Sequence, residues 1–283
     1  MNYVDVFYSS DDGLTLYARD YAGPSPGAPV VLCLPGLTRN SRDFAALADL
    51  LAQTCRVLCP DMRGRGRSMR DPTPTGYRPE RYVRDMITLL DFLDIGKVVV
   101  IGTSLGGMMA MILLSIIPHR IDAVVLNDVG PEVDARGLAR IAGYVGKSEP
   151  VDTWEAAAQQ AAHINAVAFP DYGPNDWLAM ARAIFVEQGN KLVFDYDPAI
   201  AQSIADGVIT TNFWPLFENM PSKPMLVIRG ALSDILSAET QAEMARRLPN
   251  VRNVTIAGRG HAPTLGEPDA QQAIVDFLAG LAG

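Results

Sequence analysis

The feature that most constrains the fold is a regular alternation of short apolar runs with longer amphipathic segments. Runs that are apolar without interruption predict strands buried on both faces, and the segments between them have helical periodicity. In the helix predicted at 79–93, Val83 and Leu90 belong to the apolar stripe, and Arg84 and Asp85 belong to the opposite face. The alternation predicts an α/β fold, a parallel sheet with helices on both sides. The predicted strands are 30–34, 57–60, 98–103, 123–127, 225–228 and 251–256, and the predicted helices are 41–52, 79–93, 104–117, 239–248 and 269–281.

Two stretches depart from this alternation. Near the N-terminus, residues 4–9 and 14–21 alternate around a turn signal and are interpreted as an antiparallel hairpin, which brings the expected sheet to eight strands. Residues 131–215 have helical periodicity with no convincing strand. We therefore expect a core of residues 1–130 and 216–283, with an inserted helical cap at 131–215 over the carboxyl ends of the strands.

The composition suits one large globular unit with a sizeable core. Hydrophobic residues make up 48% of the 283 residues and charged residues 20%. The net charge of −8 repels polyanions, so neither nucleic acid nor a membrane surface is expected as a partner. Residues 63–67, Arg-Gly-Arg-Gly-Arg, are interpreted as a solvated loop rather than a nucleic-acid-binding tract.

The sequence also bears on compartment and cofactors. No secretory signal is recognisable and no apolar run is long enough to span a membrane. We interpret the three cysteines as buried free thiols, which favours a cytoplasmic protein. No cluster of histidines and cysteines has metal-ligand spacing, so neither a metal nor another cofactor is expected. We expect a small-molecule substrate, and the sequence leaves open whether the chain forms a homo-oligomer.

The strongest chemical signal is Gly102-Thr103-Ser104-Leu105-Gly106-Gly107. It joins a predicted strand to a predicted helix, which is the setting of a G-x-S-x-G nucleophile turn. Small residues on either side permit the strained backbone, and the serine hydroxyl projects at the N-terminus of the helix. Ser104 is therefore the predicted nucleophile. The alternative is that it only caps the helix.

A neutral serine needs a general base. His261 comes just after the last predicted strand, at the same edge of the sheet as Ser104, and is the predicted base. His119 follows a helix end at the opposite edge and is expected at the surface. His163 lies among alanines of the predicted cap and is expected to pack there.

The base in turn needs an acid, and the tetrahedral intermediate needs two N–H donors. Asp234, after the strand that follows the cap, is the predicted acid, and Asp128, after the preceding strand, is the alternative. The backbone N–H of Leu105 is one predicted oxyanion donor. Leu37, in the loop after the strand at 30–34, is the other.

These motifs, together with residues 61–68 and 231–234, resemble the α/β-hydrolase superfamily in its capped esterase, lactonase and C–C hydrolase branch. The likeness covers nearly the whole chain and implies that the 61–68 loop shapes the edge of the site. Many members have His-Gly where this chain has Pro35-Gly36. Relatives that cleave halides or epoxides have an aspartate nucleophile, and Ser104 argues against both reactions.

The leading functional hypothesis is hydrolysis of a small, largely apolar carboxylic ester or lactone through an acyl-enzyme. Arg39, beside the predicted oxyanion loop after the strand at 30–34, is a candidate contact for a substrate carboxylate, although a surface role is favoured. The cap tryptophans Trp154, Trp177 and Trp214 are candidate substrate-binding residues. The alternative functions are hydrolysis of a C–C bond in a β-diketone-like substrate, and a small-molecule receptor that has lost efficient turnover.

Overall fold

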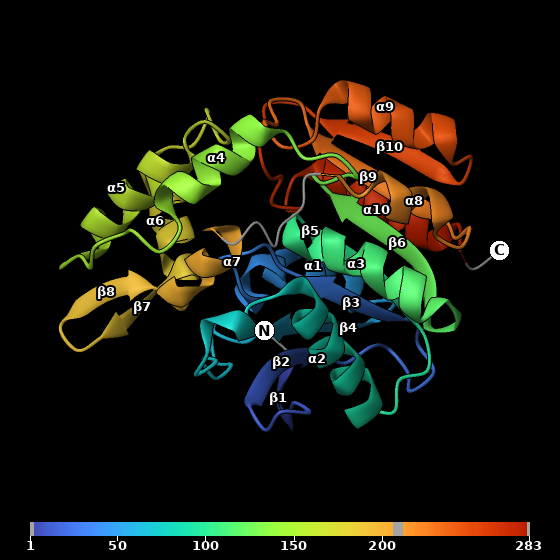
Figure 1. Cartoon of the computed structure of the whole chain (residues 1–283), viewed down its shortest axis with the longest axis horizontal. Coiled ribbons are helices and arrows are strands. Elements are labelled where there is room, and N and C mark those ends of the chain that lie inside the picture. Colours follow the sequence, from blue (N-terminus) through green and yellow to red (C-terminus); the bar gives the residue numbers. More distant parts are fainter. Residues whose placement is uncertain (1–2, 206–211, 282–283) are drawn as a thin grey trace.

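The computed structural model describes residues 3–205 and 212–281, and its centre is one twisted sheet between layers of helices (Figure 1). Within these residues the sheet has eight strands in the order β1-β2-β4-β3-β5-β6-β9-β10. β2 is antiparallel to both of its neighbours, and the other neighbouring strands are parallel. The predicted eight-stranded, mostly parallel sheet is confirmed. Its strands are β1 (Tyr3–Ser9), β2 (Thr15–Tyr21), β3 (Val30–Leu34), β4 (Arg56–Asp61), β5 (Val98–Thr103), β6 (Ile121–Asn127), β9 (Met225–Gly230) and β10 (Val251–Ile256).

Helices cover both faces of the sheet because its strands are apolar on both faces. In β3, Val31 and Cys33 pack toward one side, and Leu32 and Leu34 pack toward the other. The first side is covered by α1 (Ala45–Leu51), which follows the short helix η1 (Ser41–Phe44), and by α10 (Pro268–Ala279). The second side is covered by α2 (Pro79–Phe92), α3 (Leu105–Ile116) and α9 (Ala238–Arg247), and the connections include η2 (Pro74–Gly76) and η3 (Pro118–Arg120).

Helix α2 shows where the periodic pattern succeeds and where it fails. Val83 and Leu90 are buried on the sheet side, as predicted, and Arg84 is exposed. Asp85, however, is fully buried, although the pattern assigns it to the polar face. Its carboxylate accepts two hydrogen bonds from the guanidinium of Arg63, at 2.8 and 2.7 Å, so a charged partner takes the place of water.

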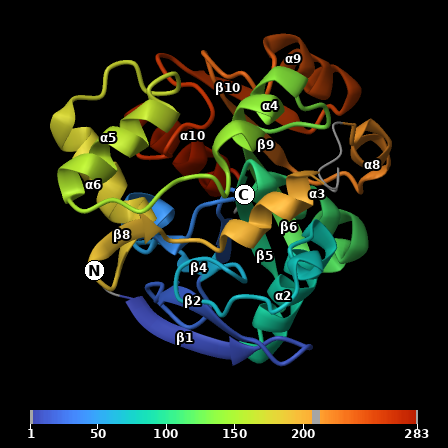
Figure 2. The same ribbon diagram turned by 60° about the vertical axis from the view of Figure 1, so that its left-hand side comes forward.

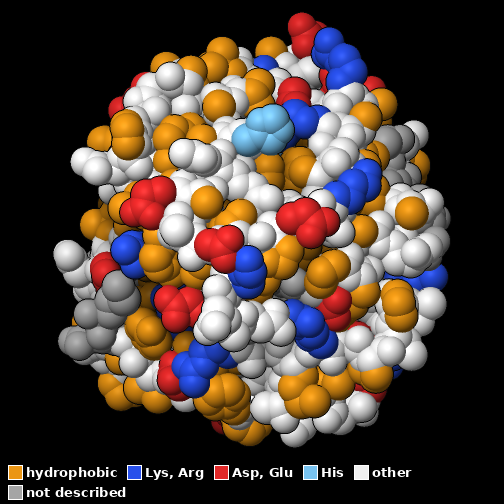
Figure 3. Space-filling view, turned by 90° about the vertical axis from the view of Figure 1, so that its left-hand side faces the viewer, with side chains coloured by type: hydrophobic (Ala, Val, Ile, Leu, Met, Phe, Trp, Pro, Cys, Tyr) orange, Lys and Arg blue, Asp and Glu red, His pale blue; other side chains and the backbone are white. Residues whose placement is uncertain are grey.

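The chain between β6 and β9 forms the inserted segment, and its elements other than α8 lie in front of the carboxyl ends of the strands (Figure 2). Helices α5 and α6 pack around a small apolar cluster of their own, which is separate from the two clusters on the sheet. Figure 3 shows the outer face of this end of the molecule, where acidic and basic side chains are interspersed rather than gathered by sign. The elements of the segment are α4 (Ala135–Tyr144), α5 (Trp154–Asn165), α6 (Pro174–Ile184), β7 (Phe185–Gln188), β8 (Lys191–Phe194), η4 (Pro198–Ile200), α7 (Ala201–Ala205) and α8 (Trp214–Asn219).

The prediction of an all-helical segment is wrong at one place. Strands β7 and β8 form an antiparallel hairpin closed by Gly189 and Asn190, with Gly189 at a φ of 61°. A two-residue Gly-Asn turn between short apolar-containing runs is a hairpin signal. The sequence therefore contains a signal for this hairpin, but the helical periodicity on either side of it led to the prediction of helix alone.

The predicted boundary at residues 215 and 216 falls inside helix α8. This helix packs against the core, since Phe217 is fully buried in the same apolar cluster as α3. Residues 206–211 of the predicted cap lie outside the described residues. Among the residues that are described, no helix combines the length and the apolar composition needed to cross a bilayer.

Candidate active site

Ser104 stands at the sharp turn between β5 and α3. Its backbone has φ 53° and ψ −116°, a strained conformation for a residue with a side chain. The turn is tight because backbones meet there: a Cβ on Gly102 would lie 2.3 Å from the carbonyl oxygen of Gly106, and one on Gly106 would lie 2.1 Å from that of Leu34. Only glycine fits at either position. The predicted geometry of the turn is therefore present in the structure.

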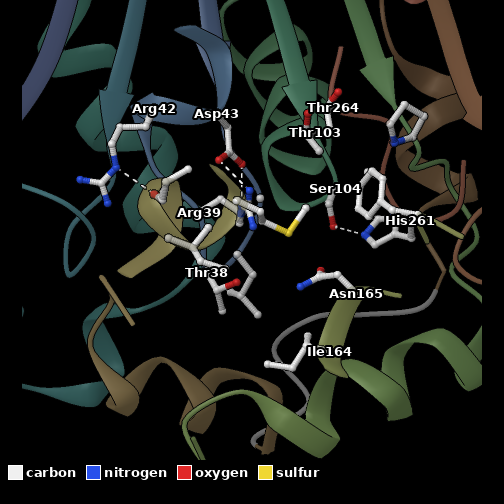
Figure 4. Close-up of a pocket in the computed structure, with 18 of the residues that line it drawn as sticks. Thr38, Arg39, Arg42, Asp43, Thr103, Ser104, Ile164, Asn165, His261 and Thr264 are labelled. Carbon is white, nitrogen blue, oxygen red and sulfur yellow. Dashed lines mark hydrogen bonds and ion pairs between the residues drawn. The ribbon is translucent and has the colours of Figure 1, made fainter. Parts of the chain in front are cut away.

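The imidazole of His261 faces the hydroxyl of Ser104 (Figure 4). Its Nε2 lies 2.9 Å from Ser104 Oγ, although the two residues are 157 positions apart in the chain. The loop after β10 carries His261, whose side chain is only 9% exposed. His119 and His163 are both exposed and take no part in this arrangement, so His163 does not pack inside the cap as the sequence suggested.

The acid beside His261 is Asp128, the alternative, and not Asp234, the predicted one. Asp128 follows β6 at a positive φ of 54°, and its Oδ2 lies 2.8 Å from His261 Nδ1. The carboxylate is fully buried. Its Oδ1 accepts a hydrogen bond from the backbone N–H of Gly230 at 2.7 Å, and its Oδ2 accepts one from Ser233 Oγ at 2.5 Å. These donors hold the carboxylate in one orientation against the imidazole.

Asp234 is paired with an arginine of the inserted segment and, within the described residues, makes no hydrogen bond with His261. Arg140 of α4 donates from Nε and Nη2 to the two carboxylate oxygens of Asp234, at 2.6 and 2.9 Å. The helix approaches the loop closely, since a Cβ on Gly137 would lie 2.2 Å from the carbonyl oxygen of Asp234. Burial acts to raise the pKa of Asp234, but the hydrogen bonds and charge of Arg140 outweigh it and hold the pKa below its ordinary value.

Two further polar residues support the pair, and the sequence analysis did not single them out. Ser233 Oγ accepts hydrogen bonds from two backbone N–H groups of its own loop, at 3.1 Å each, which directs its proton to Asp128. Asn127, fully buried, donates from Nδ2 to the carbonyl oxygen of Pro263 at 2.8 Å and so fastens the His261 loop to β6. Their only sequence signal is that each directly precedes one of the two candidate acids.

The two predicted oxyanion donors lie on either side of Ser104. Leu105 is the first residue of α3, where backbone N–H groups have no partner within the helix. Leu37 lies in the loop after β3, and Gly36 of that loop comes close enough that a Cβ there would be 3.8 Å from the Cβ of Ser104. Within residues 3–205 and 212–281, neither leucine N–H donates a hydrogen bond to another protein group.

A pocket of about 330 Å³ opens in front of Ser104 and His261. Its walls come from the loops after β3, β5 and β10 and from the inserted segment. Much of the lining is apolar or aromatic, and Asn165 of α5 faces the Ser104–His261 pair across the pocket (Figure 4). The Phe and Tyr residues that line it are Phe44, Tyr144, Phe169, Tyr172, Phe194 and Tyr196.

The prediction that the three tryptophans bind substrate is wrong, since none of them lines this pocket. Trp177 packs edge-on behind two aromatic rings that do line it, with centroids 6.4 and 5.1 Å away. Trp154 lies under the guanidinium of Arg182. Trp214 belongs to α8 on the core, where its indole N–H donates to Glu132 at 3.1 Å. Trp154 and Trp177 thus pack within the inserted segment, and Trp214 packs on the core. None of the three faces the pocket.

Arg39 lines the pocket. Its Nε and Nη2 donate to the two carboxylate oxygens of Asp43, at 2.6 and 2.9 Å, and about a quarter of the side chain is exposed. Burial acts to lower the pKa of Arg39, but the charge and hydrogen bonds of the adjacent Asp43 outweigh burial and hold the pKa above its ordinary value. The guanidinium is therefore charged and held in place by an ion pair with Asp43, which lines the same pocket.

The arginine tract at 63–67 is not the solvated loop that its charge suggested. Arg63 and Arg65 are 0% and 1% exposed, and only Arg67 is at the surface. Arg63 forms ion pairs with Asp12, Asp71 and Asp85. Arg65 donates from Nε to the carbonyl oxygen of Leu37 at 2.8 Å. Through this hydrogen bond the tract contacts the loop that carries Leu37, one of the two predicted oxyanion donors. The resemblance implied that residues 61–68 shape the edge of the site, and the Leu37 that they hold lines the pocket.

Comparison with known proteins identifies the family. A family model described as the alpha/beta hydrolase family matches residues 31–275. The chain is 36% identical to the 3-hydroxybutyrate-oligomer hydrolase of Cupriavidus necator, over 96% of this chain and 95% of that protein. It is 26% identical to the esterase YbfF of Escherichia coli, over 91% of this chain and 95% of that protein. A crystal structure of an alpha/beta hydrolase from Novosphingobium aromaticivorans matches it with a TM-score of 0.92 and 46% identity, over 98% of each chain. The chain therefore belongs to the alpha/beta hydrolase family, and it is a hydrolase.

Proposed function

We propose that the protein hydrolyses carboxylic esters through an acyl-enzyme formed on Ser104, with His261 as general base and Asp128 as its acid. The observation that carries the proposal is the continuous hydrogen-bonded chain from Asp128 Oδ2 through both imidazole nitrogens to Ser104 Oγ, at 2.8 and 2.9 Å, with a pocket beside the hydroxyl. A buried carboxylate, an oriented imidazole and a strained serine together form an activated nucleophile.

In the acylation step, Ser104 Oγ attacks the ester carbonyl carbon while its proton passes to His261 Nε2. The carbonyl π electrons move onto oxygen, and the resulting oxyanion accepts hydrogen bonds from the backbone N–H groups of Leu37 and Leu105. Asp128 stabilises the imidazolium through Nδ1–H and stays ionised. Collapse of the intermediate breaks the C–O bond of the ester, and His261 gives its proton to the leaving alkoxide, which departs as an alcohol.

Deacylation repeats these steps with water as the nucleophile. Water attacks the acyl carbon while its proton passes to His261 Nε2, and the same two N–H groups hold the second oxyanion. When the bond between carbon and Ser104 Oγ breaks, His261 returns the proton to the serine. The products are a carboxylic acid and the original serine, so the enzyme needs no cofactor for this reaction.

We further propose that the substrate is a short ester of a hydroxy acid that carries a free carboxylate. The similarity to a 3-hydroxybutyrate-oligomer hydrolase supports this class, as does a pocket of about 330 Å³ whose lining is in large part apolar or aromatic. Arg39 is the proposed carboxylate contact: Asp43 occupies its Nε and Nη2, and its Nη1 makes no hydrogen bond within the described residues. The inserted segment serves as a lid that sets the size of the acyl group. We assign the enzyme to the cytoplasm, which suits its three buried free cysteines.

Labelling with a fluorophosphonate tests the nucleophile. The probe is expected to add to Ser104 alone, as mapped by peptide mass spectrometry, and Ser104→Ala is expected to lose labelling and to lose ester turnover by about 10⁴- to 10⁶-fold. Activity of this folded variant close to that of the parent enzyme would refute the mechanism. Ligand binding with no adduct at Ser104 would instead indicate a receptor.

A panel of esters tests the substrate class. The free acids of the 3-hydroxybutyrate dimer and trimer are expected to have a higher kcat/KM than their methyl esters, and Arg39→Met is expected to remove this preference, a change of about 10-fold. Arg42→Met is the matched control, since Arg42 lines the same pocket but donates to Ala183 and Asp195. Equal rates on acid and methyl ester in the parent enzyme would exclude the carboxylate contact. Turnover of dienone acids with no ester hydrolysis would establish C–C bond cleavage instead.

A further inference from the structure

Arg65 is a buried cation that the triad does not use. It is 1% exposed, and within the described residues it forms no ion pair with a carboxylate. Its Nη2 is buried without a hydrogen-bond partner. Because a buried charge without a counter-ion is costly, its position calls for a physical explanation.

The contacts of Arg65 point to the oxyanion loop. Nε donates to the carbonyl oxygen of Leu37 at 2.8 Å, and Nη1 donates to the carbonyl oxygen of Arg63 at 2.7 Å and to the hydroxyl of Tyr82 at 2.9 Å. The ring of Tyr82 lies 4.7 Å from the guanidinium carbon and that of Tyr77 lies 5.7 Å from it, which offsets part of the cost of burial. The guanidinium is thus fixed from three sides, with one edge on the loop.

The backbone around Arg65 fastens the opposite wall of the pocket as well. Gly66 N–H donates to the carbonyl oxygen of Asp195 at 3.2 Å, and Asp197 N–H donates to that of Gly64 at 2.7 Å. Arg65 itself forms an isolated antiparallel bridge with Tyr196, which lines the pocket. One short tract therefore holds both the oxyanion loop and part of the lid.

We infer that Arg65 is a positioning residue for the oxyanion hole, an inference that rests on the proposed function. By holding the carbonyl of Leu37, it fixes the peptide next to the one that carries the Leu37 N–H, so that this N–H faces the space beside Ser104. Its positive charge forms no direct ion pair within the described residues, lies beside the loop and favours negative charge on the substrate oxygen. In this chain the loop contains Pro35-Gly36 in place of the His-Gly of many family members. The hydrogen bond from Arg65 to the Leu37 carbonyl oxygen holds this loop in place.

The experiment compares two inhibitors in Arg65→Met. An alkyl trifluoromethyl ketone accepts Ser104 Oγ at its carbonyl carbon, with the serine proton on His261, and so forms an oxyanion in the hole. The corresponding secondary alcohol fills the pocket without forming one. Arg65→Met is expected to weaken the ketone by about 10- to 100-fold and to lower kcat by a similar factor, with the Ki of the alcohol and KM nearly unchanged. Arg67→Met, in the same tract but at the surface, is expected to resemble the parent enzyme.

Each outcome decides the inference. If Arg65→Met binds both inhibitors as the parent enzyme does, or loses both equally while folded, Arg65 is not a positioning residue. Tyr82→Phe provides a second route if Arg65→Met fails to fold, because it removes one acceptor of the guanidinium and leaves the charge in place. Tyr82→Phe is expected to weaken binding of the ketone relative to the alcohol, by a smaller factor than Arg65→Met does. An unchanged ratio of the two inhibitors' Ki values would overturn the inference. Absence of any ketone adduct in the parent enzyme would contradict the proposed function instead.

Discussion

The loops after β6 and β9 each present an aspartate at the same edge of the sheet, and the two carboxylates have opposite roles. Asp128 is fully buried and faces His261 at 2.8 Å. Asp234 is 30% exposed and forms a two-point ion pair with Arg140 of the inserted segment. The first carboxylate holds the imidazole of His261, the proposed base, and the second forms an ion pair between helix α4 and the loop after β9.

The difference lies in what surrounds each carboxylate and not in where the chain places it. Asp128 receives a backbone N–H and a serine hydroxyl, neutral donors that leave its charge available to the imidazole. Asp234 receives a guanidinium, which neutralises it. An acid that is already paired with an arginine has little charge left to stabilise an imidazolium, so burial with neutral donors supports Asp128 as the proposed acid.

The largest expected effect comes from exchanging each carboxylate for an amide. Asp128→Asn is expected to lower kcat by about 10³- to 10⁴-fold, because an amide does not hold the reactive imidazole tautomer. Asp234→Asn is the matched control, with an expected loss of less than about 10-fold. Steady-state kinetics on a p-nitrophenyl ester measures both. The opposite order of losses would return the acid to Asp234 and overturn the assignment.

A smaller effect is expected from removing the hydroxyl of Ser233, which joins the loop after β9 to the loop after β6. Ser233→Ala removes the 2.5 Å hydrogen bond to Asp128 and is expected to lower kcat by about 10-fold with little change in KM, because the carboxylate loses part of its orientation. Ser233→Thr keeps a hydroxyl and is expected to restore most of the rate. A threonine variant as slow as the alanine variant would assign the loss to loop packing.

The smallest expected effect concerns stability. A double-mutant cycle with Arg140→Met and Asp234→Asn, followed by urea unfolding, is expected to give a coupling of about 1 kcal/mol at neutral pH, the scale of a partly exposed ion pair. Coupling near zero would mean that the pair does not tie α4 to the core. Arg136→Met is the matched control, since Arg136 pairs with Asp134 at the exposed start of the same helix.

The coupling between Arg140 and Asp234 is also expected to depend on pH. The pKa of Asp234 in the folded protein lies below its ordinary value, so the pair stabilises the fold above that ordinary value, about 4, and the stabilisation is lost as the pH falls through the folded pKa. Repeating the cycle between pH 7 and pH 3 tests this sign. Coupling that grows as the pH falls would contradict the structure.

Much of the fold was predictable because its signals are local. The periodicity of α2 and the uninterrupted apolar strands predict their elements within a few residues, and Gly102 and Gly106 report the turn at Ser104 directly. His261 was predictable from its place after the last strand. By contrast, the burial of Asp85 depends on Arg63, which lies 22 positions away and has no periodic relation to it.

The sequence by itself determined the parallel sheet, the strained serine and the histidine that faces it, since chain order and turn chemistry fix which groups emerge at the carboxyl edge of the strands. Only the tertiary structure decided which acid faces His261, which aromatic rings line the pocket and what the arginine tract supports. Strands β6 and β9 are neighbours, so both aspartates reach the same edge, and the choice between them depends on Ser233 and Arg140. The choice of acid depends on contacts between residues that lie 90 or more positions apart in the chain, and local sequence patterns do not report contacts at that separation.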